Sequence, residues 1–132
     1  MSLAGSIQSA PNGTLGFDTD TVVASSVGQQ FFQQGYRFCL RYLSLTAGQS
    51  SGDLSPGEAG NILGAGLALM PVQHVRSAGW QPTGSLGQQD GANAANNAAA
   101  VGFPTGVNVG RDSLKSGAYR RILLFKTGNR VA

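Results

Sequence analysis

The sequence has little that would cross-link the chain, hold a metal or anchor it in a membrane. It contains one cysteine, Cys39, so no disulfide can form within the chain, and one histidine, His74. No Cys, His or carboxylate stands at metal-ligand spacing from His74, so we expect no metal and no cofactor. No stretch reaches the ~18 apolar residues of a membrane-spanning helix. The N-terminus lacks a basic start followed by an apolar core, so we expect no signal peptide.

Common catalytic motifs are also missing. The chain has no G-x-x-x-x-G-K-[ST] phosphate loop, no G-x-G-x-x-G after a predicted strand and no G-x-S-x-G elbow. Nucleotide-binding and serine-hydrolase functions therefore lose their usual support in the sequence.

Charged residues are scarce and unevenly placed. They make up 11% of the chain, and the formal net charge is +3. Residues 1–110 carry three basic and five acidic side chains, whereas residues 111–132 carry six basic and one acidic. Such a tail could bind nucleic acid with a steep dependence on salt. Neither aromatic interleaving nor a nucleic-acid-binding motif accompanies it, so we expect no nucleic-acid partner and a solvated tail.

The chain does have a regular alternation of predicted elements within a length that suits one domain. Residues 1–13 are small and polar and predict a flexible leader. Predicted strands cover residues 14–18, 36–42, 67–75 and 106–110, with Pro71 indicating a bulge or early fraying in the third. Predicted helices cover residues 24–34, 55–65 and 85–101.

The predicted helices carry end signals of unequal strength. Ser55 followed by Pro56 and Glu58 is the clearest start signal. The other predicted caps are Ser25 or Ser26 and Ser85, and the predicted stops are Gly35, Gly66 and Gly102. The first helix is expected to present Val27, Phe31 and Phe32 on one face.

Helices between consecutive strands imply an α/β fold of repeated βα units with parallel strands and right-handed crossovers. In such sheets the chemistry lies at the carboxyl ends of the strands. The polar residues at these ends are Asp18 and Asp20, Arg41 and Tyr42, and Gln73 and His74. We expect them to converge on one rim and form a binding site.

Each of these residues also has an ordinary structural interpretation. Asp18 or Asp20 could stabilise a cationic transition state at a sugar, or could cap the following turn. His74 could donate or accept a hydrogen bond at the rim, or could be structural. Trp80 could stack on a sugar ring, or could cover the core. Arg41 could pair with Asp18, or could be solvated.

Four blocks of sequence resemble a known family. GFDTDT, QQGYRFCLRYL, DLSPGEAGNILGAGLALMPVQ and GWQPTGSLGQQDGANAANNAAAVGFPTGVNV occur in this order over residues 14–109. They resemble the bacterial DUF1906 or Rv2525c-like glycoside-hydrolase-like domain, which is similar to lysozyme-type glycoside hydrolase family 25. The resemblance implies the first half of a TIM-like (β/α)8 barrel over residues 14–110, and a secreted or cell-envelope location.

The resemblance also implies which residues form the site, and it ends after Val109. In the family an acidic cluster follows the fourth strand, but here Asp112 is the only acid after Val109. The change coincides with the jump in charge at residue 111, so we predict a basic tail over 111–132 that departs from the family through a frameshift, truncation or engineering. Because a barrel needs ~250 residues, we expect an open sheet edge, covered by residues 118–126 or by a homo-oligomer.

The function implied by the resemblance is hydrolysis of a cell-wall glycan similar to peptidoglycan, weak or absent in this chain. The alternative is a non-catalytic module that binds carbohydrate or the cell envelope. The predicted catalytic residues are Asp18 and Asp112, and the predicted substrate-binding residues are Asp20, Arg41, Tyr42, Gln73, His74 and Trp80.

Overall fold

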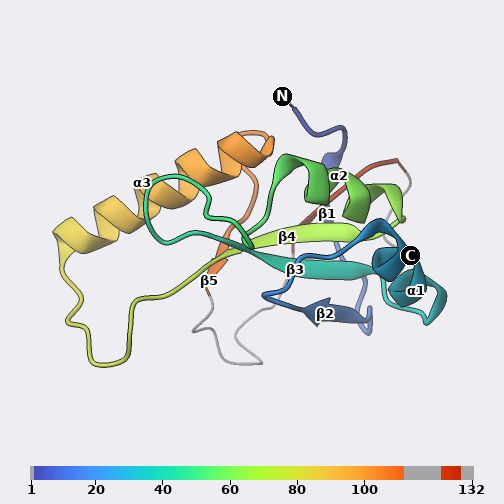
Figure 1. Ribbon diagram of the computed structural model, residues 1–132, viewed down its shortest axis with the longest axis horizontal. Helices are drawn as coiled ribbons and strands as arrows, with labels where there is room; N and C mark the ends of the chain where they lie inside the picture. The colour runs from blue at the N-terminus through green and yellow to red at the C-terminus, as the bar shows by residue number, and fades with distance from the viewer. Residues whose placement is uncertain (1, 112–122, 129–132) are drawn as a thin grey trace.

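A computed structural model describes residues 2–111 and 123–128 as three helices packed on a mixed sheet (Figure 1). The strands are β1 (Ser6–Ser9), β2 (Gly16–Asp18), β3 (Phe38–Leu43), β4 (Ala68–Gln73), β5 (Gly110–Arg111) and β6 (Leu123–Lys126). The helices are α1 (Ser25–Gln33), α2 (Pro56–Gly64) and α3 (Gly84–Val101).

The sheet confirms the predicted α/β class and its parallel pairs. Its strand order is β1-β6-β4-β3-β2, and β5 also pairs with β4. β2, β3, β4 and β5 form parallel pairs in the order expected from their connecting helices. The pairing of β3 with β4 runs unbroken from Phe38–Ala68 to Leu43–Gln73, so the bulge or early fraying predicted at Pro71 is wrong.

Two strands from the ends of the chain join the sheet in antiparallel pairs. Residues 6–9, which the sequence placed in a flexible leader, instead form β1, with Ile7 opposite Phe125 of β6. The leader is held there because Leu3 packs against the core and its backbone N–H donates to the carbonyl of Gly102 (2.9 Å).

The prediction that residues 118–126 cover the sheet edge is confirmed for its last four residues. β6 pairs with β4 at Leu69–Phe125, and Phe125 is fully buried. Residues 118–122 lie outside the described residues. β5 and β6 therefore share one edge of β4, with β5 at its carboxyl end.

The best cap signal in the sequence is confirmed. α2 begins at Pro56, and the Ser55 hydroxyl accepts a hydrogen bond from the backbone N–H of Glu58 (3.1 Å). The Glu58 carboxylate does not bind back to the start of the helix. It is buried in the core, where it pairs with Arg41.

The other predicted caps are wrong. α1 begins after Ala24, which makes no side-chain cap bond. α3 begins after Thr83, whose hydroxyl accepts from the N–H of Leu86 (3.1 Å), so Ser85 lies inside the helix. The predicted stop is confirmed, because Gly102 ends α3 with a left-handed backbone (φ 115°).

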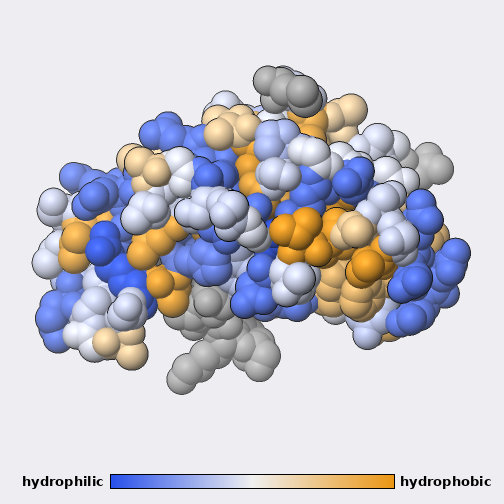
Figure 2. Space-filling model, in the orientation of Figure 1, coloured by the Kyte–Doolittle hydropathy of each residue, from blue (hydrophilic) through white to orange (hydrophobic). Residues whose placement is uncertain are grey.

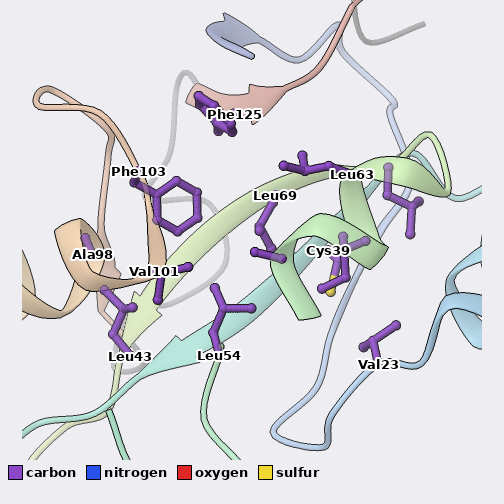
Figure 3. Close-up of a cluster of buried hydrophobic side chains, with 13 residues drawn as sticks. Val23, Cys39, Leu43, Leu54, Leu63, Leu69, Ala98, Val101, Phe103 and Phe125 are labelled. Atoms are coloured by element: carbon purple, nitrogen blue, oxygen red, sulfur yellow. The ribbon is translucent and has the colours of Figure 1, made fainter. Parts of the chain in front are cut away.

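The two faces of the sheet bury different side chains because successive residues of a strand point to opposite sides. Figure 3 shows the larger cluster, in which Cys39, Leu43 and Leu69 meet Val101 of α3 and Phe125 of β6. The opposite face carries a smaller cluster of Phe38, Ala68, Met70 and Leu124. The helices α2 and α3 cover the first face (Figure 1).

The close contact between β2 and β3 on the second face requires a glycine. A Cβ built on Gly16 would lie 2.1 Å from the Phe38 ring, much closer than a side chain allows. Phe17, the next residue, points to the other side and stacks on Phe31 of α1 with ring centroids 3.8 Å apart. Asp18 therefore returns to the face that Gly16 occupies.

The expected apolar face of α1 is partly wrong. Val27 is 38% exposed, whereas Gly28 is buried against Ala65 and Leu67. Figure 2 shows hydrophobic residues interrupted by hydrophilic ones over this side of the molecule. Within residues 2–111 and 123–128, no helix has the length and apolar character needed to cross a membrane.

Candidate functional site

The carboxyl ends of β2, β3 and β4 meet at one edge of the sheet and form an open cavity. In Figure 1 these three strands point the same way, and the loop between β4 and α3 extends beyond their ends. The cavity has a volume of about 380 Å³ and is lined by Asp18, Thr19, Asp20, Tyr42 and His74. Four of these five residues were predicted from the sequence.

Alternation along the strands explains which predicted residues reach the cavity. Tyr42 pairs with Val72, and His74 follows Val72 by two residues, so both side chains point to the same face of the sheet. This face holds Phe38 and Met70 and lies away from the helices. The adjacent residues Arg41 and Gln73 face the helices instead. The expected convergence of all strand-end polar groups is therefore correct for one face only.

Asp18 is one of two exposed carboxylates that line the cavity. The Tyr42 hydroxyl donates to its Oδ2 (3.2 Å), and the side chain is otherwise exposed. The turn after β2 is closed by the Thr19 hydroxyl, which accepts from the N–H of Thr21 (3.1 Å). The capping role considered for Asp18 and Asp20 thus belongs to Thr19. Asp20 accepts a long hydrogen bond from the Thr21 hydroxyl (3.4 Å).

His74 is held between an aromatic ring and a carboxylate. Its imidazole stacks on the Tyr42 ring with centroids 4.5 Å apart and planes 17° from parallel. Its Nε2 lies 2.9 Å from Oδ1 of Asp53, and Oδ2 of Asp53 accepts from the Ser44 hydroxyl (2.5 Å). Sequence reasoning missed Asp53, although its place in the loop after β3 was a signal that it lies near the rim.

Both alternatives considered for Arg41 are wrong, because its side chain is neither solvated nor paired with Asp18. The guanidinium is fully buried on the helix side, where Nε and Nη2 donate to the Glu58 carboxylate (2.5 and 2.8 Å). Burial acts to lower the pKa of Arg41, but the hydrogen bond and charge of Glu58 outweigh it, and the pKa lies above its ordinary value.

The buried ion pair ties together the loops that carry the rim. Arg41 also donates to the carbonyls of Gly52 (2.7 Å) and Thr19 (3.4 Å), and Glu58 accepts from the N–H of Val23 (2.8 Å). One salt bridge therefore joins the loop after β2, the loop after β3 and α2.

Gln73 and Trp80 also lie outside the cavity lining. Gln73 is buried and donates to the carbonyl of Asp90 on α3 (2.8 Å). Trp80 is partly buried in the loop after β4, with the Arg76 guanidinium 5.9 Å from its ring centroid. Arg76 in turn binds Asp90 through two hydrogen bonds (3.0 and 2.7 Å). Asp112 lies outside the described residues.

A second cavity, of about 430 Å³, lies between α3 and the segment that leads to β5. Its lining is mainly apolar and includes Ala94, Ala98, Phe103 and Val107. None of its lining residues carries an ionisable side chain. The side chains suited to acid–base catalysis line the first cavity instead.

Two other kinds of site find no support in the described part of the chain. No three His, Cys, Asp or Glu residues there are placed to hold a metal ion. Burial raises the pKa of the Cys39 thiol to about 12, which keeps it protonated and unreactive at neutral pH.

Comparisons with known proteins bear on the family and the fold. A family model described as Rv2525c-like, glycoside hydrolase-like domain matches residues 29–113. Two crystal structures of the Mycobacterium tuberculosis Tat-secreted protein Rv2525c, one with HEPES and one with L-tartrate, share the fold, each with 20% identity and a TM-score of 0.57. Each alignment covers 83% of this chain and 52% of that protein, so this chain spans about half its length. No curated protein matches this chain.

Proposed function

The chain belongs to the Rv2525c-like, glycoside hydrolase-like domain family, and on this premise we propose that the rim cavity binds a cell-wall glycan similar to peptidoglycan. In this proposal Asp18 is the catalytic carboxylate, and Asp20, Tyr42 and His74 contact the sugar. The observation that carries it is the exposed Asp18 carboxylate, held by the Tyr42 hydroxyl inside an open cavity. A carboxylate so placed stabilises the cationic transition state of glycosidic cleavage.

The proposal extends to the architecture. Parallel β2, β3, β4 and β5, each joined to the next through a segment that includes a helix, support residues 14–110 as the first half of a TIM-like barrel. In this division residues 1–13 and 111–132 flank the domain in the sequence, and β1 and β6 from these flanking segments pair with its sheet. The similar protein Rv2525c is Tat-secreted, which supports a secreted or cell-envelope location for this chain.

Other predicted residues enter the proposal differently. Trp80 is proposed as a sugar platform because its loop extends beyond the strand ends (Figure 1). Asp112 is kept as the second catalytic acid. Arg41 and Gln73 have no place in the proposed glycan contact, because both side chains are buried towards the helices. A homo-oligomer through β2 is also proposed, since β2 ends the strand order of the described sheet.

A second function, glycan binding without cleavage, is favoured by one observation. Asp18 and Asp20, the carboxylates that line the cavity, come from the same strand end. Glycosidases that use two carboxylates place them on opposite sides of the scissile bond, ~5–9 Å apart. Asp53 is already engaged by Ser44 and His74.

Turnover of labelled peptidoglycan separates the two functions. If the chain is an enzyme, wild-type protein is expected to release reducing ends slowly, and Asp18→Asn is expected to reduce that release at least ~100-fold, the usual contribution of such a group. Asp20→Asn, which removes a charge without touching Tyr42, is the matched control and should cost less.

Each alternative outcome has a clear meaning. Saturable binding without release of reducing ends from wild-type protein would replace the enzyme with the binding module. Absence of both binding and release would overturn the proposed function.

A further inference from the structure

We propose that Asp53 is a positioning residue that fixes the tautomer of His74 and turns its Nδ1 into an acceptor for a sugar hydroxyl or amide N–H. This inference rests on the proposed function for its ligand. It assigns a role to a carboxylate that neither the strand-end pattern nor the cavity lining includes.

The tautomer follows from the chemistry of the contact. An ionised carboxylate only accepts hydrogen bonds, so the 2.9 Å contact between Nε2 of His74 and Oδ1 of Asp53 places the ring proton on Nε2. In the neutral ring the other nitrogen, Nδ1, then carries a lone pair. The His74 side chain is 36% exposed and the Asp53 side chain 14%, so the ring and not the carboxylate is the accessible partner.

Asp53 is held in one orientation by its own loop. Its second oxygen accepts from the Ser44 hydroxyl (2.5 Å), and that hydroxyl accepts from the N–H of Ser50 (2.9 Å). The N–H of Ser44 donates to Oε1 of Gln49 (2.7 Å), and Nε2 of Gln49 donates to the carbonyl of Leu54 (2.8 Å). The loop therefore brings Asp53 to His74 already oriented.

Helix α3 holds the same loop from outside. The Asn97 amide donates to the carbonyls of Ser44 (3.0 Å) and Thr46 (2.9 Å), and its oxygen accepts from the N–H of Gly48 (3.0 Å). Asn97 is buried, with 2% of its surface exposed. Burial of this polar side chain costs desolvation energy, and its three hydrogen bonds to the loop offset that cost. These bonds hold the loop that carries Asp53 in one shape.

Tyr42 contacts the face of the His74 ring, and Asp53 contacts its edge at Nε2. The Tyr42 hydroxyl also binds Asp18. His74 and Asp18 thus line the same cavity, each with capacity to accept a hydrogen bond. The site so described selects ligands with two donor groups, such as the hydroxyl and N-acetyl N–H groups of an amino sugar.

Nitrogen NMR of the single histidine tests the tautomer without any ligand. When its ring is neutral, ¹⁵N-labelled His74 should show a protonated Nε2 with slowed proton exchange and an unprotonated Nδ1. Asp53→Ala should speed exchange of the Nε2 proton about tenfold, as expected for loss of one hydrogen bond. Asp53→Asn, which keeps an acceptor oxygen, should restore part of the protection, and Asp20→Ala should leave the tautomer unchanged.

Addition of a muramyl disaccharide then tests the ligand. The Nδ1 resonance of the wild-type protein should shift on saturation, and Asp53→Ala should weaken binding about tenfold without loss of far-UV circular dichroism.

A proton on Nδ1 in the free protein would overturn the inference and leave the proposed function intact. Binding that depends on Asp18 but leaves Nδ1 unshifted would also overturn it. Failure of the sugar to bind at all would remove the proposed function, and with it the ligand of Nδ1, whatever the tautomer.

Discussion

Arg41 and Glu58 form a buried ion pair beneath the rim, and neither charge has access to water as another partner. Arg41→Ala leaves the Glu58 carboxylate buried without its counter-charge and frees the carbonyl of Gly52. We expect a loss of about 3–5 kcal/mol in the free energy of unfolding, measured by urea denaturation.

The double variant Arg41→Met/Glu58→Leu removes both charges and should recover part of this loss. The N–H of Val23 would still lose its acceptor, so recovery should be incomplete. A loss below about 1 kcal/mol for Arg41→Ala would contradict a buried pair.

The buried thiol of Cys39 predicts a specific pH dependence. Burial raises its pKa to about 12, whereas an exposed thiol in the unfolded chain titrates near ~8.5. The folded state keeps the proton that the unfolded state loses, so the thiol's contribution to stability is complete below about pH 8.5 and declines as the pH rises above it.

Comparison of the wild type with Cys39→Ala isolates this effect from other groups that titrate at high pH. Between pH 8.5 and 10.5 the stability of the wild type should fall more steeply, by up to ~1.4 kcal/mol per pH unit. Parallel pH profiles for the two proteins would contradict the raised pKa.

At this scale the sequence predicted the rim positions but not the directions of all their side chains. Asp18, Tyr42 and His74 were correctly brought together. Arg41 and Gln73 were not, because the period of two along a strand sends neighbours to opposite faces. Asp53 was missed since its contact with His74 depends on how the loop after β3 folds, which is not encoded in a strand or helix pattern.

Among the helices, the start of α3 offers a direct comparison of two neighbouring hydroxyls. Thr83 accepts from the N–H of Leu86, whereas Ser85 lies in the first turn. Thr83→Ala should lower the free energy of unfolding by about 0.5–2 kcal/mol, and Ser85→Ala by less than about 0.5 kcal/mol. Thermal denaturation of the two variants decides between the positions, and the reverse order would contradict the observed helix start.

The cap of α2 was predictable and that of α3 was not, for a physical reason. Ser55 was accompanied by Pro56, which fixes the first helical residue. Before α3, Thr83 and Ser85 both carry a hydroxyl that could cap the helix. Which of them does so depends on where the backbone becomes helical, and the sequence does not show this. Likewise β1 and β6 carry no local signal of their pairing, because they come from opposite ends of the chain.

For the molecule as a whole, β6 is expected to protect the sheet from self-association. Deletion of residues 117–132 would remove Phe125 from Leu69 and Phe103 and would open one edge of β4. An open edge is a template for pairing with another chain. The shortened protein should therefore form larger assemblies than the full chain in size-exclusion chromatography with light scattering.

Deletion of residues 127–132 alone, which keeps β6, is the matched control and should leave the oligomeric state of the full chain unchanged. If the larger deletion also leaves that state unchanged, β6 does not act as a cover.

The central claim is that parallel strands gather Asp18, Tyr42 and His74 into one glycan site. Amide chemical-shift mapping with a muramyl disaccharide tests it most directly, because a rival cavity lies beside α3. Saturable shifts are expected at Asp18, Tyr42 and His74, with one dissociation constant. Shifts confined to Ala94, Ala98 and Phe103, or none at saturating sugar, would contradict it.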